Sequence, residues 1–132
     1  MAIQSTLNDA GLEPETVGYI NAHGTGTQAN DVTETEAIRS VFQSHADRLA
    51  ISSTKSMHGH ALGASGGLEL IAAVMALKES MIPPTANFTS SGEGCDLDYV
   101  PNEAREAKLT AALSNSFAFG GLNAVLAVRA IS

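Results

Sequence analysis

Residues Val17–Asn30, with the sequence VGYINAHGTGTQAN, decide the fold class of this chain. Val17–Ala22 is rich in strand-forming residues and leads directly into a loop, His23–Asn30, that contains two glycines and two threonines. Asp31 and Glu34 then have the spacing of a capping box, followed by an amphipathic pattern, which predicts a helix beginning near Asp31. A strand, a polar loop and a helix in this order form the first part of a parallel crossover, which indicates an α/β fold.

The same order of elements is found outward from this segment. Leu49–Ser52 is predicted to be a strand, Ser53–Ser65 a loop, and residues 66–79 a helix that we expect to be buried because it is apolar on nearly every side. A helix is predicted at Ala2–Asp9, residues 85–108 look irregular, and two strands joined by a glycine pair close the chain at residues 109–119 and 124–131. Because functional loops of such sheets gather at the carboxyl ends of the strands, residues 23–30, 53–65 and 117–123 are expected to converge on one site.

The composition predicts one domain and excludes some classes of partner. The chain has 132 residues, of which 44% are hydrophobic, and its net charge of -7 argues against nucleic acid or an anionic membrane as partner. The longest apolar run, Leu70–Leu77, is too short to cross a bilayer, and Met1–Asn8 lacks a signal-peptide pattern. A single cysteine, Cys95, gives no disulfide framework and favours a cytoplasmic location.

Two histidines, His23 and His60, are the first candidates for chemistry. Each lies in a loop after a predicted strand, and two imidazole N–H groups aimed at one point would form an oxyanion hole. The alternatives are two unrelated loop histidines, a zinc site that adds His58 and Asp31, or a phosphate cradle in the Gly/Thr loop. We expect no metal, because the His-Gly-His spacing and the lack of a complete ligand set fit zinc poorly, and the loop matches neither common phosphate-binding pattern.

Other residues are expected to support or gate this site. Glu69 interrupts an apolar helix and needs a partner if it is buried, and Lys55 is the closest preceding basic residue; the alternative is a glutamate that faces solvent. Cys95 lies among acidic residues that disfavour a thiolate, so we interpret it as incidental. Phe117 and Phe119 come before a glycine pair, where the backbone is free to hinge, and are either core residues or a gate.

Five motifs in one register resemble the β-ketoacyl-ACP synthase (ketosynthase) family of fatty-acid and polyketide synthesis. They are NAHGTGT at residues 21–27, KSMHGH followed by ALGASG at 55–66, PTAN at 84–87, CDLD at 95–98, and NSFAFGG at 115–121 followed by Asn123. The similarity spans nearly the whole chain. It implies a thiolase-like half in which a mixed sheet lies between helix layers, with one of the usual five strands missing.

The resemblance also implies a mechanism at matching positions. His23 and His60 correspond to the histidines that stabilise the thioester oxygen of malonyl-ACP while carbon dioxide leaves. Thr25 and Thr27 correspond to residues that hydrogen-bond the phosphopantetheine arm of the carrier protein, so no separate cofactor is expected.

Further positions correspond to residues that organise the family's site. Lys55 and Glu69 match a charged pair, Asp31 matches a structural acid, and Phe119 matches a gate. Leu122 and Ala118 depart from the family's usual threonine and glycine, which puts the mobility of that gate in doubt.

The family's nucleophilic cysteine lies in its N-terminal half, which we expect to be absent here. The chain is therefore predicted to be inactive in condensation alone, and to bind a cysteine-bearing half in a homo- or hetero-oligomer and to work with an acyl carrier protein. The alternative functions are a non-catalytic partner of the chain-length-factor type and a carrier-binding module.

Overall fold

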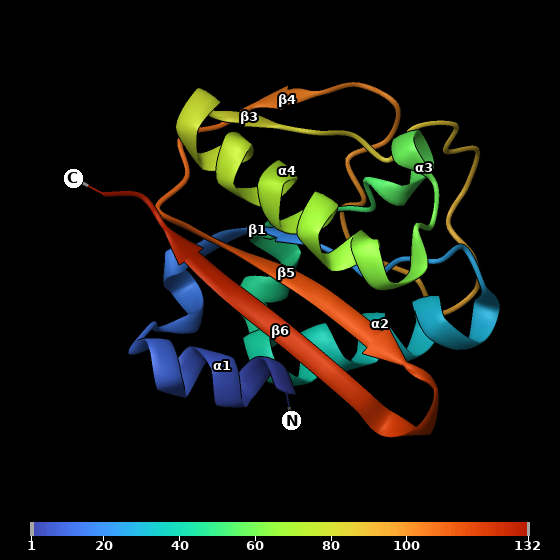
Figure 1. Ribbon diagram of the computed structural model, residues 1–132, viewed down its shortest axis with the longest axis horizontal. Coiled ribbons are helices and arrows are strands. Elements are labelled where there is room, and N and C mark those ends of the chain that lie inside the picture. Colours follow the sequence, from blue (N-terminus) through green and yellow to red (C-terminus); the bar gives the residue numbers. More distant parts are fainter. Residues whose placement is uncertain (1, 132) are drawn as a thin grey trace.

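A four-stranded mixed sheet organises residues 2–131, the part of the chain that the computed structural model describes (Figure 1). Its strand order is β2-β1-β5-β6, in which β1 is parallel to both of its neighbours and β6 is antiparallel to β5. The strands are β1 (Val17–Asn21), β2 (Ala50–Ser52), β5 (Ala111–Ala118) and β6 (Leu122–Arg129). The predicted α/β class, with parallel crossovers and a closing hairpin, is therefore confirmed.

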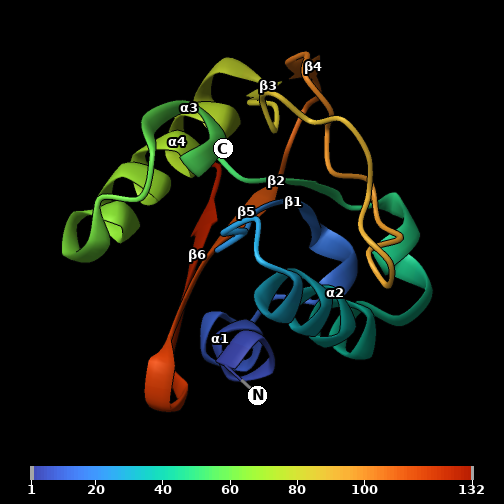
Figure 2. The same cartoon turned by 90° about the vertical axis from the view of Figure 1, so that its right-hand side faces the viewer.

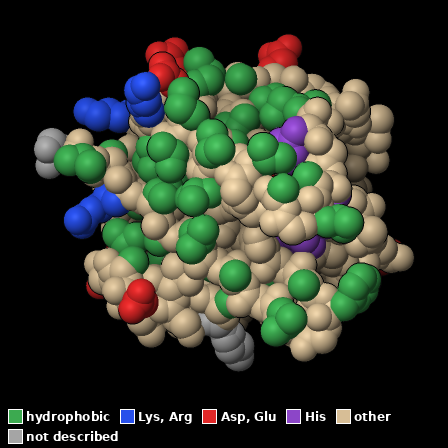
Figure 3. Space-filling view, in the orientation of Figure 1, with side chains coloured by type: hydrophobic (Ala, Val, Ile, Leu, Met, Phe, Trp, Pro, Cys, Tyr) green, Lys and Arg blue, Asp and Glu red, His purple; other side chains and the backbone are tan. Residues whose placement is uncertain are grey.

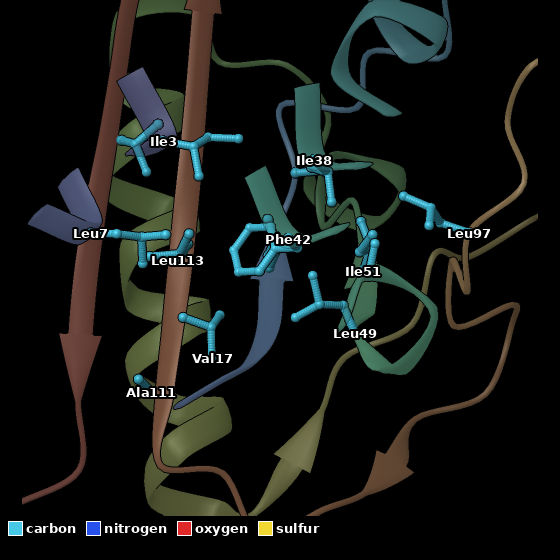
Figure 4. Close-up of a cluster of buried hydrophobic side chains, with 14 residues drawn as sticks. Ile3, Leu7, Val17, Ile38, Phe42, Leu49, Ile51, Leu97, Ala111 and Leu113 are labelled. Carbon is cyan, nitrogen blue, oxygen red and sulfur yellow. The ribbon is translucent and has the colours of Figure 1, made fainter. Parts of the chain in front are cut away.

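Helices cover both faces of this sheet and make three layers (Figure 2). Helices α1 (Ala2–Ala10) and α2 (Gln28–Phe42) lie on one face, and α4 (Ser65–Glu79) lies on the other. The larger core, between the sheet and α1 and α2, is built from aliphatic side chains around Phe42 (Figure 4). The smaller core under α4 contains Tyr19 and several alanines, so the helix packs close to the sheet.

The start of α2 differs from the sequence prediction. The helix begins at Gln28 rather than near Asp31, with Thr27 in an extended conformation before it and no side-chain cap. Asp31 therefore lies in the first turn, and the predicted capping box is wrong. The reason is that Glu34 points inward, where its carboxylate accepts hydrogen bonds from the backbone N–H groups of His23 and Gly24.

Helix α4 has nearly the predicted ends, but the prediction that it is buried is wrong for half of its surface. Ser65, Glu69, Ala73 and Ala76 are buried and face the sheet. On the other side Leu68, Ile71, Val74 and Met75 are exposed, with Ile71 at 62%. Figure 3 shows apolar side chains gathered on this side of the molecule. The sheet covers only one side of α4, and no segment within residues 2–131 covers the other side.

The connection from α4 to β5 is largely irregular, as predicted, but it contains a small second sheet of β3 (Met81–Ile82) and β4 (Arg105–Glu106). Thr85 anchors this connection, since its hydroxyl donates to the Tyr99 carbonyl and accepts from the Ser53 N–H. The remaining helical elements are one-turn or 3₁₀ segments: α3 (Lys55–His58), Pro14–Thr16, Gln43–Arg48, Leu62–Ala64 and Phe119–Gly121. Among the described helices, none has the length and apolar character needed to cross a bilayer.

Candidate active site

The candidate site lies where the three parallel strands end. The register aligns Asn21 of β1 with Ser52 of β2 on one side and with Ser114 of β5 on the other. The loops that follow β1 and β2 carry His23 and His60, whose ring centroids lie 5.7 Å apart. The Phe117 ring, near the end of β5, lies 5.9 Å from that of His23. The predicted convergence is therefore confirmed for the loops that carry His23 and His60, and for Phe117 alone among residues 117–123.

Hydrogen bonds determine which ring nitrogen of each histidine is free. The Lys55 ammonium, which can only donate, lies 3.4 Å from His23 Nδ1. The Leu62 N–H donates to His60 Nδ1 at 3.1 Å, and the Ser65 hydroxyl lies 2.9 Å from the same atom. Because each Nδ1 is an acceptor, each neutral ring carries its proton on Nε2. Both Nε2–H groups are thus left as hydrogen-bond donors.

The environment of His23 keeps its ring neutral. Burial, followed by the positive charge of Lys55 and by His60, lowers the pKa of His23 to about 4, and Asp31 opposes this shift. At neutral pH the ring is therefore a neutral donor. The rings of His23 and His60 meet edge to face, with an interplanar angle of 86°.

Lys55 and Glu69 form a buried ion pair, as predicted, and the alternative of a solvent-facing Glu69 is wrong. The exposed fractions of their side chains are 6% and 0%. The ammonium of Lys55 also donates to the His23 carbonyl oxygen at 2.6 Å, so that its three N–H groups meet Glu69, the His23 carbonyl and the His23 ring. Lys55 thereby ties α4 to the loop after β1.

Glu34 is a central residue of the site that sequence reasoning missed. Its carboxylate accepts hydrogen bonds from the backbone of His23 and Gly24 and from the side chains of Asn30 and Asn115, at 2.9–3.3 Å. Burial raises the pKa of Glu34, while these donors oppose that shift by favouring the anion. The signal in the sequence was its spacing of four from Ile38, which places Glu34 on the buried face of α2.

Asn21, the last residue of β1, bonds to the loop after β2 and to α4. Its amide N–H₂ donates to the Thr54 hydroxyl at 3.0 Å and to the Glu69 backbone carbonyl at 3.1 Å. Two buried acceptors in this region, Glu69 Oε2 and Asn115 Oδ1, have no hydrogen-bond partner among residues 2–131. Most buried polar groups near the site are thus hydrogen-bonded, but these two acceptors are not.

A cavity of about 810 Å³ opens beside His60 and the loop after β1; Ala22 and Gly24 line it, whereas His23 does not. Thr25, Asp31, Lys55, His60 and Cys95 are among the residues that line it. Thr27 is not among the lining residues, but its hydroxyl lies 3.0 Å from that of Thr25. Asp31 accepts a hydrogen bond from the neighbouring Asn30 amide.

The two phenylalanines have different positions. Phe117 is partly buried beside His23, whereas Phe119 is fully exposed at the tip of the β5–β6 hairpin. The structure thus brings only one of the two predicted gating residues to the histidines. The hairpin turn contains Gly120 and Gly121 at φ of +80° and +79°, a region that glycine adopts without steric cost.

His23, His58, His60 and Asp31, the residues of the alternative zinc site, do not form a metal-binding group in the structure. Within residues 2–131, no three His, Cys, Asp or Glu side chains are grouped as metal ligands. The Nδ1 atoms of His58 and His60 contact the Gly59 carbonyl and the Ser65 hydroxyl respectively.

Comparisons with known proteins place these features in a family. The sequence model described as "Beta-ketoacyl synthase, C-terminal domain" matches residues 1–89. Nodulation protein E from a Rhizobium species is 58% identical over 98% of this chain and 32% of its own length. The 3-oxoacyl-acyl-carrier-protein synthase 2 of a Synechocystis species is 56% identical over 97% of this chain and 31% of its own length.

Solved structures agree with the sequence comparisons. A type II polyketide ketosynthase, solved in complex with its acyl-carrier protein and bound to a hexaketide, superposes with a TM-score of 0.95 at 38% identity. The match covers 98% of this chain and 32% of that one. The chain therefore spans about a third of the length of the relatives it matches.

Proposed function

Because this chain belongs to the β-ketoacyl synthase family, matching its C-terminal domain over residues 1–89, we propose that it supplies the histidine oxyanion site of a decarboxylative condensing enzyme. The substrate is a malonyl thioester carried on the phosphopantetheine arm of an acyl carrier protein. Its partner in the reaction is an acyl group held on a cysteine outside these residues. The product is a β-ketoacyl thioester lengthened by two carbons.

One observation carries this proposal: the two histidine rings lie together with both Nε2–H groups unoccupied. Lys55 holds the Nδ1 atom of His23, and a backbone N–H holds that of His60, so neither ring can turn its proton away from the site without losing a bond. The lowered pKa of His23 keeps it a neutral donor. Two fixed N–H donors aimed at a thioester oxygen stabilise the negative charge that develops there.

The chemistry follows from that charge. The bond between C2 of the malonyl group and its carboxylate breaks, carbon dioxide leaves, and the electron pair forms an enolate whose oxygen accepts from His23 and His60. C2 then attacks the acyl carbonyl on the cysteine, a carbon–carbon bond forms, and the carbon–sulfur bond breaks to release the thiolate. No proton has to be removed by the histidines in this sequence, so neutral donors suit it.

The other residues position these donors and the substrate. Lys55, paired with Glu69, fixes the ring and carbonyl of His23. Thr25 lines the cavity and is proposed, with Thr27, to hydrogen-bond the phosphopantetheine arm. Asp31 lies at the same cavity wall.

Phe117 and Phe119 of the β5–β6 hairpin are proposed to control access to the site. Phe117 packs against His23, so its movement would open or close access to that ring. Phe119 stands exposed on the glycine turn, from which it could close over an acyl chain bound by the remaining part of the enzyme.

The exposed apolar side of α4 is the proposed surface for the cysteine-bearing part. Leu68, Ile71 and Val74 lie on it and are between 40% and 62% exposed. Such a patch is characteristic of a buried interface rather than of a surface in contact with water. The proposal includes no nucleophilic role for Cys95, so residues 1–132 alone are expected to be inactive in condensation.

Malonyl-ACP decarboxylation by the assembled enzyme tests the proposal. His23→Ala and His60→Ala should each slow decarboxylation about 10²–10³-fold, because each removes one oxyanion donor, while transfer of the acyl group to the cysteine continues. His60→Gln is the matched control, since its amide can place an N–H near the position of Nε2 and should retain part of the rate. Decarboxylation at the parent rate in either alanine variant would show that the donors are assigned wrongly.

A further inference from the structure

His58 lies in the loop that carries His60, where its ring contacts Gly59 and Thr54, but it belongs to none of the groups assigned above. It is the last residue of the single-turn helix α3 and is exposed. Its Nδ1 lies 2.9 Å from the Gly59 carbonyl oxygen, and its Nε2 lies 3.0 Å from the Thr54 hydroxyl. The His58 side chain thus bridges Thr54 and Gly59, the residues that flank the helical turn before His60.

We propose that His58 is a positioning residue that orients His60 through the Gly59 carbonyl and Asn21 through the Thr54 hydroxyl. This inference rests on the proposed function, because the loop that His58 restrains carries His60, and Thr54 links that loop to Asn21, two residues before His23. The His58 ring makes one such contact through each of its nitrogens.

The first step concerns the peptide bond between Gly59 and His60. Gly59 has φ of +75° and ψ of -179°, and the space beside its Cα is open, since no atom lies within 4 Å of the place that a Cβ would occupy. The N–H of Gly59, which belongs to the preceding peptide, donates to the Lys55 carbonyl at 2.8 Å, and the Gly59 carbonyl accepts from the His58 ring. Without the ring, the carbonyl that orients the following His60 would lose its only side-chain restraint among the described hydrogen bonds.

The second step concerns the link to the other loop. The Thr54 hydroxyl that meets His58 is also 3.0 Å from Asn21 Nδ2 and 3.3 Å from Asn21 Oδ1. Asn21 ends β1 two residues before His23 and also donates to the backbone of α4. The His58 ring therefore fixes the direction of a hydroxyl that also bonds to the Asn21 side chain at the end of β1.

The hydrogen bonds also determine the tautomer of His58. A carbonyl oxygen can only accept, so Nδ1 must carry a proton, and the neutral ring leaves Nε2 to accept from the Thr54 hydroxyl. Then that hydroxyl accepts from Asn21 Nδ2. This tautomer is the opposite of that of His60, whose Nδ1 accepts a backbone N–H. The two histidines, separated by one glycine, should therefore give different ring-nitrogen signals.

The test uses the intact protein labelled with ¹⁵N in its histidine rings and spectra recorded at alkaline pH. We expect His58 in the Nδ1–H form and His60 in the Nε2–H form. His58→Leu removes both contacts and should convert His60 into a mixture of tautomers. It should also slow malonyl decarboxylation about tenfold, the rate change that corresponds to losing one ordinary hydrogen bond, without slowing acylation of the cysteine.

Two conservative variants separate the two contacts. An asparagine at this position can still donate from near Nδ1, so His58→Asn should retain the His60 tautomer and most of the rate, whereas His58→Gln should retain only the contact with Thr54. Met57→Leu, on the same turn and without a side-chain hydrogen bond, is the matched control and should change neither readout.

An Nε2–H form of His58, or a His58→Leu protein with an unchanged His60 spectrum, would overturn the assignment. If the spectra behave as expected but neither parent nor variant decarboxylates malonyl-ACP, the positioning role stands and the proposed function fails.

Discussion

The buried pair of Lys55 and Glu69 allows a quantitative prediction of how each partner contributes to stability. Both side chains are almost fully buried, at 6% and 0% exposure. Breaking a buried pair by removing one partner costs about 3–5 kcal/mol, whereas an exposed pair contributes about 0–1 kcal/mol. Burial alone therefore predicts a large loss of folding free energy from either single substitution.

The contacts of the two partners predict that the losses are unequal. In Lys55→Met, the Glu69 carboxylate loses its only hydrogen-bond donor among residues 2–131, because its Oε2 already has none. In Glu69→Gln, Lys55 keeps the amide oxygen and the two acceptors of His23. We therefore expect Lys55→Met to lose about 3–5 kcal/mol and Glu69→Gln about 1–3 kcal/mol.

Denaturant unfolding of the assembled protein measures both values, and the double variant Lys55→Met/Glu69→Gln tests their coupling. If the partners act as a unit, the double variant loses no more stability than Lys55→Met alone. Losses below about 1 kcal/mol that add in the double variant would refute the reasoning, because they are typical of a pair in contact with water.

Three other predictions concern the loop after β1. Gly24→Ala should lower the free energy of unfolding by at least about 2 kcal/mol, because Gly24 has φ of +39° and a Cβ there would lie 2.6 Å from the Cβ of Ser53. Gly26→Ala is the control: Gly26 has φ of +73° but open space around it, so in the same unfolding measurement this variant should show only the smaller loss due to the backbone conformation. Glu34→Gln should lower the free energy of unfolding by about 1–3 kcal/mol for each buried donor left without an acceptor, and it should slow malonyl decarboxylation. Unchanged stability would contradict the role assigned to the Glu34 carboxylate. The pKa of His23 is lowered from 6.5 to about 4, so between these pH values the unfolded chain binds more protons than the folded chain. The stability that is present above pH 6.5 should therefore be lost as the pH falls towards 4. His23→Gln should reduce this pH dependence of unfolding, and an unchanged profile would show that another group causes it.

The sequence by itself determined the class of the fold and the place of the site. The strand and loop at Val17–Asn30 predicted the parallel crossover, and the register of β1 with its two neighbours confirmed where the loops meet. The buried pair was also predictable, because Glu69 interrupts an apolar helix and a buried carboxylate requires a partner. These inferences depend on local patterns and on the rule that parallel strands end at a common edge.

Only the tertiary structure decided which groups bond to which. The capping box was expected from a spacing of three residues. Glu34 instead turns inward, because the backbone N–H groups of His23 and Gly24, in the loop before α2, need an acceptor. The proton position on each histidine likewise depends on neighbours from other loops, such as Lys55 beside His23. The apolar composition of α4 predicted burial on every side, but within residues 2–131 only one side of the helix is covered. Hydrophobicity indicates that a surface is more stable when it is buried, but it does not indicate which segment buries it.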